Sequence, residues 1–139
     1  MKLNAYISFN GNCREALEFY AGALGGKVIS MIPYSEMPAG AGMPISPELS
    51  DKIMHGRVEV DGDWIMASDA PPERYRAPQG IQMSASINDV AQAEAAYAKL
   101  SAGGTIVMPM TETFWAQRFA MFQDKFGISW MINCEKPRP

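Results

Sequence analysis

The sequence of 139 residues lacks the features that mark several specialised classes of protein. Its two cysteines, Cys13 and Cys134, stand near opposite ends and cannot make a disulfide framework. No apolar run approaches the roughly 20 residues that a membrane-spanning helix needs. The net charge of -3 gives no basic surface for nucleic acid or anionic membrane. We therefore expect a globular protein with no nucleic-acid or membrane partner.

From its opening residues we expect no signal peptide. Its opening, "MKLNAYISFNG", alternates apolar and polar residues like a strand and has no continuous apolar segment. We accordingly expect reduced thiols and a cytoplasmic location. Cys13 falls in the predicted first turn of a helix, where the helix dipole can lower the pKa of a thiol. The alternative is that Cys13 is only a small residue that fits the start of this helix.

An internal repeat dominates the sequence. "SFNGNCREALEFYAGALGGKVIS" (residues 8–30) aligns without a gap with "SINDVAQAEAAYAKLSAGGTIVM" (residues 86–108). Each copy reads as a strand, an amphipathic helix, a glycine pair and a second strand. Two further predicted strands follow in each half, so the chain is a β-α-β-β-β unit used twice. We place the two modules at about 1–72 and 79–136, within a single domain covering 1–139.

Local signals fix several boundaries within the first module. Asn12 and Glu15 have the spacing of a helix N-cap and its capping box. Gly25-Gly26 predicts the end of that helix, because glycine adopts the left-handed conformation without steric cost. Asp61-Gly62 predicts a tight hairpin turn. Asp69, which precedes "APP", is interpreted as a turn-forming carboxylate rather than a catalytic one.

Two longer connections interrupt the strands. Residues 36–51, "EMPAGAGMPISPELSD", are rich in Pro, Gly and Ser, and such a long loop in a compact domain is often a lid or binding loop. Residues 70–80 join the halves. In the second half, Trp130 alternates with Ser129 and Met131, so we predict that Trp130 packs beneath the outer helix.

The doubled unit, with "FYAGALGG" closing its first helix, resembles the vicinal oxygen chelate superfamily. That superfamily includes glyoxalase I, extradiol dioxygenases, and the fosfomycin- and bleomycin-resistance proteins. The stretches "NAYISFNGNCREALEFYAGALGG" and "ETFWAQRFAMFQDKFGISWMIN" look most similar to its PhnB-like subgroup. The resemblance implies an α+β fold in which the two modules form a cupped, eight-stranded mixed sheet with the helices outside. It also implies a small-molecule ligand and a homodimer.

Metal-dependent members of this superfamily carry a ligand on the first and last strands of each module. The corresponding positions here are read as Ala5, Met66, Gln82 and Met131. A divalent Lewis-acid metal needs His, Asp, Glu or Cys ligands, so we expect no metal and no other cofactor. The alternations also predict an inward set that lines the cup, namely Ala5, Ile7, Trp64, Met66, Gln82, Ser84, Ser129 and Met131.

Polar candidates remain in two places. His55, the one histidine, shares a strand face with Arg57 and Glu59, but alternation does not decide whether that face lines the cup or meets solvent. If it lines the cup, His55 and Glu59 can act as an acid/base pair and Arg57 as an anion clamp. Met-rich strands are more often core filler than a ligand-binding surface, and the same structural interpretation applies to tryptophans such as Trp64.

The segment "TETFWAQRF" (residues 111–119) mixes aromatic and charged residues, as the rim of a binding site does. We expect it at the turn between the sixth and seventh strands, with Arg118 pairing either with Glu112 or with a ligand anion. The leading hypothesis is a protein that binds a small molecule without a metal and without chemistry. The alternative is a lyase, isomerase or other enzyme with Glu112 and His55 as acid/base residues. Candidate ligand-binding residues are Phe114, Trp115, Arg118, Arg57, Met66, Gln82 and Met131.

Overall fold

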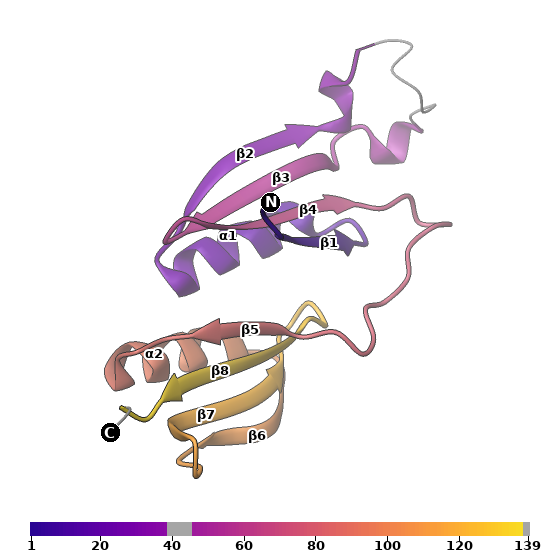
Figure 1. Ribbon diagram of the computed structural model, residues 1–139. Coiled ribbons are helices and arrows are strands. Elements are labelled where there is room, and N and C mark those ends of the chain that lie inside the picture. Colours follow the sequence, from indigo (N-terminus) through magenta and orange to yellow (C-terminus); the bar gives the residue numbers. More distant parts are fainter. Residues whose placement is uncertain (39–45, 138–139) are drawn as a thin grey trace. The chain divides into compact units, whose positions relative to one another are not determined.

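The computed structural model describes residues 1–38 and 46–137. The chain divides into two compact units, residues 1–76 and 77–139 (Figure 1). The first unit contains β1 (Ala5–Phe9), α1 (Cys13–Leu24), β2 (Lys27–Pro33), the short 3-10 helices η1 (Tyr34–Glu36) and η2 (Pro47–Leu49), β3 (Ile53–Val60) and β4 (Asp63–Asp69). The second contains β5 (Met83–Ser86), α2 (Val90–Ser101), β6 (Thr105–Thr111), β7 (Ala116–Gln123) and β8 (Ser129–Glu135).

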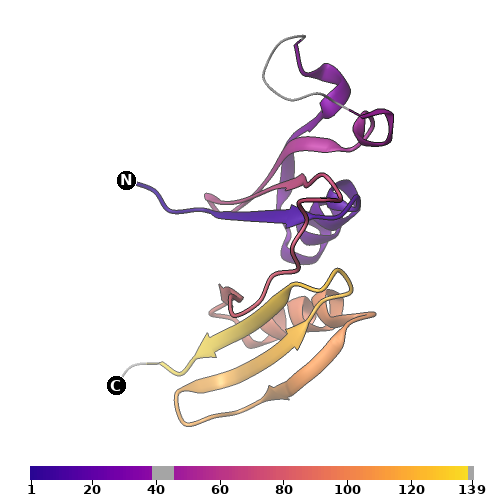
Figure 2. The same ribbon diagram turned by 90° about the vertical axis from the view of Figure 1, so that its right-hand side faces the viewer.

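Both units have the same sheet topology. The strand orders are β1-β4-β3-β2 and β5-β8-β7-β6. In each sheet the first and last strands pair in parallel, whereas the remaining pairs are antiparallel. One helix lies against one face of each sheet (Figure 2). The predicted α+β fold of two βαβββ modules is therefore confirmed.

The core of each unit lies between its helix and its sheet. In the first unit, Leu17 and Tyr20 of α1 are fully buried together with Val58 and Ala67 of the sheet. A Cβ atom on Gly56 of β3 would lie 2.5 Å from Leu17 Cδ1, so α1 packs directly on the strand backbone there. In the second unit the buried residues include Ala93, Ala96, Leu100, Ala120, Phe122, Trp130, Ile132 and Cys134, which confirms the placement predicted for Trp130.

The turn signals read from the sequence are largely confirmed. Gly25 follows α1 with φ of 70°, in the left-handed region where glycine is favoured. Asp61 and Gly62 join β3 to β4 with φ values of 49° and 86°, as a hairpin turn with two positive φ angles requires. The proposed lid or binding loop at residues 36–51 includes residues 39–45, which lie outside the described part of the chain.

Asn12 is the N-cap residue of α1, as predicted, but its side chain makes no capping hydrogen bond. The Cys13 N–H instead donates to Asp69 Oδ1, at 3.0 Å, across 56 residues of sequence. A buried carboxylate on the neighbouring strand thus replaces the local cap, because it reaches the first helical N–H directly. In the described residues, no helix is long and apolar enough to cross a bilayer.

Candidate binding site on the helix-free sheet faces

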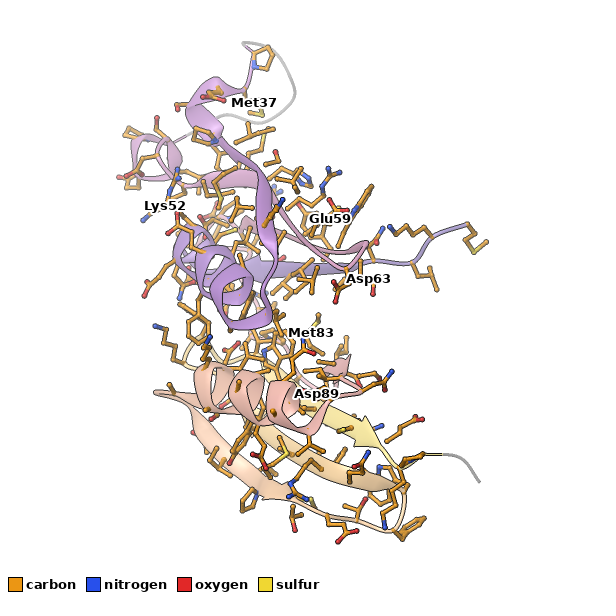
Figure 3. The ribbon with its side chains drawn as sticks, turned by 90° about the vertical axis from the view of Figure 1, so that its left-hand side faces the viewer. Met37, Lys52, Glu59, Asp63, Met83 and Asp89 are labelled. Atoms are coloured by element: carbon orange, nitrogen blue, oxygen red, sulfur yellow. The ribbon has the colours of Figure 1, made fainter. Side chains whose placement is uncertain are left out.

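The polar side chains of β3 point away from α1. Val58 and Ala67 are buried on the α1 side, so their strand neighbours project to the other side of the sheet. Figure 3 shows Glu59 on the side of the sheet opposite α1. We call this side the helix-free face of the first unit, and its members are Tyr6, Ser8, His55, Arg57, Glu59, Trp64, Met66 and Ser68. It brings His55, Arg57 and Glu59 onto the same surface as Met66.

His55 has a partner on this face that the sequence analysis missed. The Tyr6 hydroxyl lies 3.2 Å from His55 Nδ1, and the two ring centroids are 5.8 Å apart. Depending on the imidazole tautomer, either group can donate this hydrogen bond. A phenol and an imidazole joined in this way can exchange a proton with a bound molecule. The alternation of "AYISF" was sufficient to place Tyr6 on the face opposite Ile7, but not to pair it with His55.

Arg57 lies over the Trp64 ring, with the guanidinium carbon 4.1 Å from the ring centroid. Lys2 Nζ is 4.3 Å from the same centroid. Cation–π contacts of this kind contribute about 0.5–1 kcal/mol at exposed sites and more where they are desolvated. Arg57 Nε is buried and has no hydrogen-bond partner in the described residues. The arginine is therefore positioned by stacking, and none of the described residues accepts a hydrogen bond from its Nε–H.

The strand register corrects part of the predicted inward set. Ala5 pairs with Ile65 and Ile7 pairs with the buried Ala67, so both lie on the α1 side of the sheet. Tyr6, not Ala5, is the β1 residue opposite Met66. The predicted position on β1 was wrong by one residue, and because successive residues of a strand face opposite sides, this error placed it on the wrong face.

The second unit has a helix-free face of different composition. Trp130 and Ile132 are buried against α2, so Met131 and Asn133 project to the other side. Register places Ser84 and Met121 beside Met131. The members of this face are Ser84, Ser86, Trp115, Phe119, Met121, Ser129, Met131 and Asn133. Gln82 is exposed and directly precedes β5.

Trp115 belongs to this second helix-free face. Its indole Nε1–H donates to Asn133 Oδ1 at 3.1 Å, and its ring packs edge-on against Phe119 with centroids 5.2 Å apart. Phe114 in turn packs edge-to-face against Trp115, with ring centroids 4.8 Å apart, and remains 89% exposed. The aromatic part of the "TETFWAQRF" segment therefore flanks the helix-free face, in the turn between β6 and β7 where the sequence placed it.

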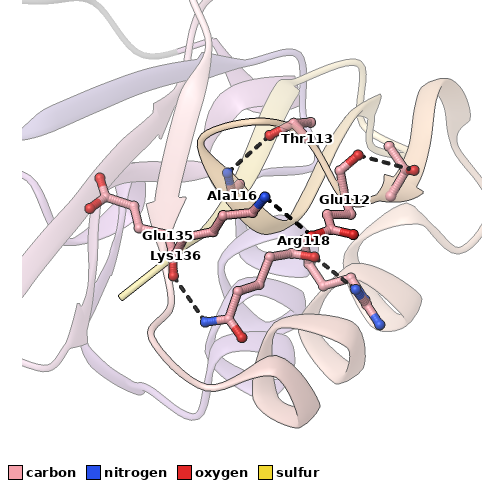
Figure 4. Close-up of polar contacts among 8 residues, drawn as sticks. Glu112, Thr113, Ala116, Arg118, Glu135 and Lys136 are labelled. Carbon is pink, nitrogen blue, oxygen red and sulfur yellow. Dashed lines mark hydrogen bonds and ion pairs between the residues drawn. The ribbon is translucent and has the colours of Figure 1, made fainter. Parts of the chain in front are cut away.

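The charged part of that segment points elsewhere. Glu112 pairs with Lys136 at 3.2 Å, and Thr113 accepts a hydrogen bond from the Ala116 N–H (Figure 4). Arg118 pairs with Glu94 of α2, with 2.9 Å between Nε and Oε1. The expected pairing of Arg118 with Glu112 is therefore wrong. Arg118 pairs with Cys134 in register and so lies on the α2 side of the sheet.

A separate hollow lies at the carboxyl ends of β1 and β4. Its volume is about 350 Å³, and its lining includes Asn10, Asn12, Lys52 and Asp69. Asp69 accepts backbone hydrogen bonds from three N–H groups of the first unit. This carboxylate is therefore engaged by the fold, and the hollow contains none of the candidate ligand-binding residues.

Cys13 is a buried thiol next to that carboxylate. It is 0% exposed, and burial, followed by the charge of Asp69, raises the pKa of the Cys13 thiol from 9.0 to about 12. Burial also raises the pKa of the Tyr34 hydroxyl, again with a further contribution from Asp69. A thiol with so high a pKa carries almost no thiolate at neutral pH, which favours the structural interpretation of Cys13.

Comparison with known proteins places the chain in a family. Residues 2–132 match the Glyoxalase/Bleomycin resistance protein/Dioxygenase superfamily. The chain belongs to this superfamily. Protein YjdN of Escherichia coli (strain K12) is 36% identical over 145 residues, covering 100% of this chain and 99% of that protein.

Solved structures agree with this assignment to the glyoxalase superfamily. Protein PA1353 from Pseudomonas aeruginosa is 40% identical, with a TM-score of 0.89 and coverage of 99% of both chains. A PhnB protein from Bacillus cereus, described as a putative 3-demethylubiquinone-9 3-methyltransferase, is 20% identical, with a TM-score of 0.78 and coverage of 96% and 99%. At that identity the Bacillus protein supports the fold alone.

The metal ligands implied by the glyoxalase superfamily are a poor fit to these residues. By register, the first and last strands carry Tyr6 opposite Met66 in the first unit and Ser84 opposite Met131 in the second. Thioethers are soft donors, and a neutral phenol or hydroxyl is a much weaker ligand for a divalent Lewis acid than His, Asp or Glu. Within residues 1–38 and 46–137, no cluster of three or more His, Cys, Asp or Glu side chains is placed to hold a metal ion.

Proposed function

We propose that this chain is a PhnB-like member of the glyoxalase superfamily that binds a small organic molecule without a resident divalent metal. The first-unit helix-free face supports this proposal most directly. At the strand positions where metal-dependent members carry ligands it has Tyr6 and Met66. Around them lie a cation, an aromatic ring and an imidazole, the mixture of apolar wall and few polar groups found in small-molecule sites.

Thermal-shift screening of the full chain against small organic acids, amides and cytotoxic compounds tests this proposal. A true ligand should raise the melting temperature equally in chelator and in added divalent metal, because no step of binding requires the metal. The Met66→Lys variant should lose the shift, since it places a charge at the centre of the helix-free face. Val107→Lys is the matched control because Val107 is 68% exposed on β6.

Two results would contradict the proposal. One is that no compound produces a shift that Met66→Lys removes. The other is that chelator abolishes the shift and divalent metal restores it.

We propose further that the protein is a cytoplasmic homodimer. Support for the dimer comes from the family resemblance rather than from a described contact. Size-exclusion chromatography with light scattering measures the mass in solution, and a single monomeric species across concentrations would refute this part.

A second candidate function is acid/base catalysis on the same face, favoured by the hydrogen bond between Tyr6 and His55. Glu112, the other predicted catalytic residue, belongs to the second unit and is ion-paired with Lys136. Exposed ion pairs of that kind contribute roughly 0–1 kcal/mol to stability, and such a pair is an ordinary surface role for Glu112. Acid/base catalysis is tested by a turnover assay with methylglyoxal and glutathione that compares wild type with His55→Gln and Glu112→Gln. Equal activity in all three would remove this candidate.

A further inference from the structure

The strongest unexplained feature of the first unit is the guanidinium of Arg57. Its Nε is buried without a hydrogen-bond partner in the described residues. A buried donor without a hydrogen bond costs about 1–3 kcal/mol of folding free energy, and more when the group is charged. Native structures rarely retain such a group unless it has a role or binds something. Arg57 Nε–H therefore lacks an acceptor among the residues that the structure describes.

The neighbours of Arg57 do not provide that acceptor. Across the sheet, Arg57 is opposite Met66 on one side and Ser30 on the other. Glu59 shares the helix-free face, but no ion pair joins it to Arg57 in the described residues, and its partner in register is Lys27. The cationic charge of Arg57 is therefore not neutralised by the nearest carboxylate on its own strand.

The Trp64 ring orients Arg57 for a planar acceptor. With the guanidinium carbon 4.1 Å from the ring centroid, the ring restricts the guanidinium before any ligand arrives. A pre-ordered guanidinium loses less freedom on binding and presents two N–H groups in a fixed fork. The terminal N–H groups of the fork can donate to an oxyanion that neutralises the charge, and a small rotation of the side chain would let the buried Nε–H donate to it as well.

Other groups on the face suit the same ligand. Lys2 brings a second positive charge to the Trp64 ring, at 4.3 Å. Tyr6, in the same cross-strand row as Met66 and Arg57, offers with His55 a neutral hydrogen-bonding pair. An organic molecule can thus place an oxyanion on Arg57 and a second polar group towards Tyr6, with Met66 as the apolar contact between them.

We propose that the helix-free face of the first unit is an oxyanion-binding site, in which Arg57, held on Trp64, grips the carboxylate or phosphate group of a small organic ligand. This inference rests on the proposed ligand-binding function and specifies the class of ligand. Carboxylate and phosphate share the chemistry that Arg57 recognises, so the experiment compares them directly.

The test is a titration of the ¹⁵N-labelled full chain with benzoate, phenyl phosphate and the neutral benzamide, monitored at the arginine Nε–H signals by NMR. The Arg57 signal is assigned by its loss in Arg57→Lys. Benzoate or phenyl phosphate should shift that signal in a saturable way, and benzamide should not. The tighter of the two oxyanions identifies the ligand class.

Variants supply the control. Arg57→Gln should weaken oxyanion binding about ten-fold or more, equivalent to roughly 1.4 kcal/mol. Arg57→Lys keeps the charge but loses the fork, so we expect it to bind less tightly than wild type. Arg118→Gln should bind like wild type, because Arg118 lies on the α2 side of the other sheet and pairs with Glu94. The backbone amides of β3 and β4 report binding in every variant, so loss of the arginine signal does not end the measurement.

The inference is overturned if the oxyanions leave the Arg57 signal unmoved, or if Arg57→Gln binds them as wild type does. If neutral compounds still give a thermal shift that Met66→Lys removes, the proposed function stands and only the assignment of an oxyanionic ligand is refuted. If no compound gives such a shift while the oxyanions leave Arg57 unmoved, both proposals fail.

Discussion

Replacing Asp69 by Asn should unfold the first unit far more easily, although the change removes only a charge. Asp69 is 1% exposed. Its Oδ1 accepts from the Gly11 N–H at 2.9 Å and the Cys13 N–H at 3.0 Å, and its Oδ2 accepts from the Ile53 N–H at 2.9 Å. One carboxylate at the end of β4 therefore holds the start of α1 and the start of β3.

The magnitude follows from counting acceptors. Asparagine has one side-chain oxygen, so it can occupy the Oδ1 position and still serve Gly11 and Cys13. Its amide group then faces the Ile53 N–H, which loses its acceptor and costs about 1–3 kcal/mol. Loss of the negative charge weakens the two retained hydrogen bonds by about 0.5 kcal/mol each, since bonds to charged groups are stronger than neutral ones. We expect a total loss of roughly 2–4 kcal/mol.

Urea unfolding gives the free energy change, and native-state hydrogen exchange locates it. The Ile53 amide should exchange faster than the Gly11 and Cys13 amides in Asp69→Asn. Asp63→Asn is the control, because Asp63 is an exposed aspartate at the other end of β4, where surface changes stay within about 0.5 kcal/mol. A loss below about 1 kcal/mol in Asp69→Asn, with Ile53 protection unchanged, would refute the reasoning.

Further predictions concern Cys13 and two glycines. The Cys13 thiol should resist a soluble disulfide reagent in native protein and react once urea unfolds the chain; rapid reaction of the native thiol would contradict its burial. Because the pKa of Cys13 is raised to about 12 in the folded state, its contribution to stability is complete below pH 9.0 and is lost as pH rises towards 12. Urea midpoints should therefore fall across that window, and Cys13→Ala should reduce the fall. Gly22→Ala, at an exposed site in α1 with nothing within 4 Å, should stabilise by about 0.5–1 kcal/mol in thermal unfolding. Gly104→Ala should instead destabilise the protein, because its Cβ would collide with the Gln123 carbonyl oxygen. Equal changes in stability for Gly22→Ala and Gly104→Ala would contradict this steric argument.

The sequence was a good guide to elements because their signals are local. The internal repeat, the helix stop at Gly25 and the turn at Asp61-Gly62 each depend on a few neighbouring residues, and each is found in the structure. The N-cap position of α1 was predicted, but the acceptor of its first N–H was missed because Asp69 is 56 residues away from Cys13. The start of α2 shows the contrast, since Asp89 accepts from the Gln92 N–H only three residues on, at 2.8 Å. Capping from sequence succeeds only where the acceptor is local.

The candidate site was harder to predict because it depends on register. Composition identified Arg57, Met66 and His55 as candidates, but alternation gives two equivalent faces and cannot choose between them. A one-residue error then exchanged Tyr6 for Ala5. The charged residues of the "TETFWAQRF" segment led to a wrong predicted ion pair. Arg118 pairs with Glu94, and Glu112 pairs with Lys136.

The helix-free faces of the two units differ in composition, which supports our proposal that a ligand binds to them. The strand order is the same in both, and at equivalent rows Tyr6 and Met66 correspond to Ser84 and Met131. Methionine occurs in both rows, whereas the Tyr6 phenol and its imidazole partner His55 occur in the first unit alone. Packing against a helix does not require that difference, because these side chains point away from it. If our proposal holds, a ligand with one polar end and an apolar body would use this difference, and Arg57 would select the polar end.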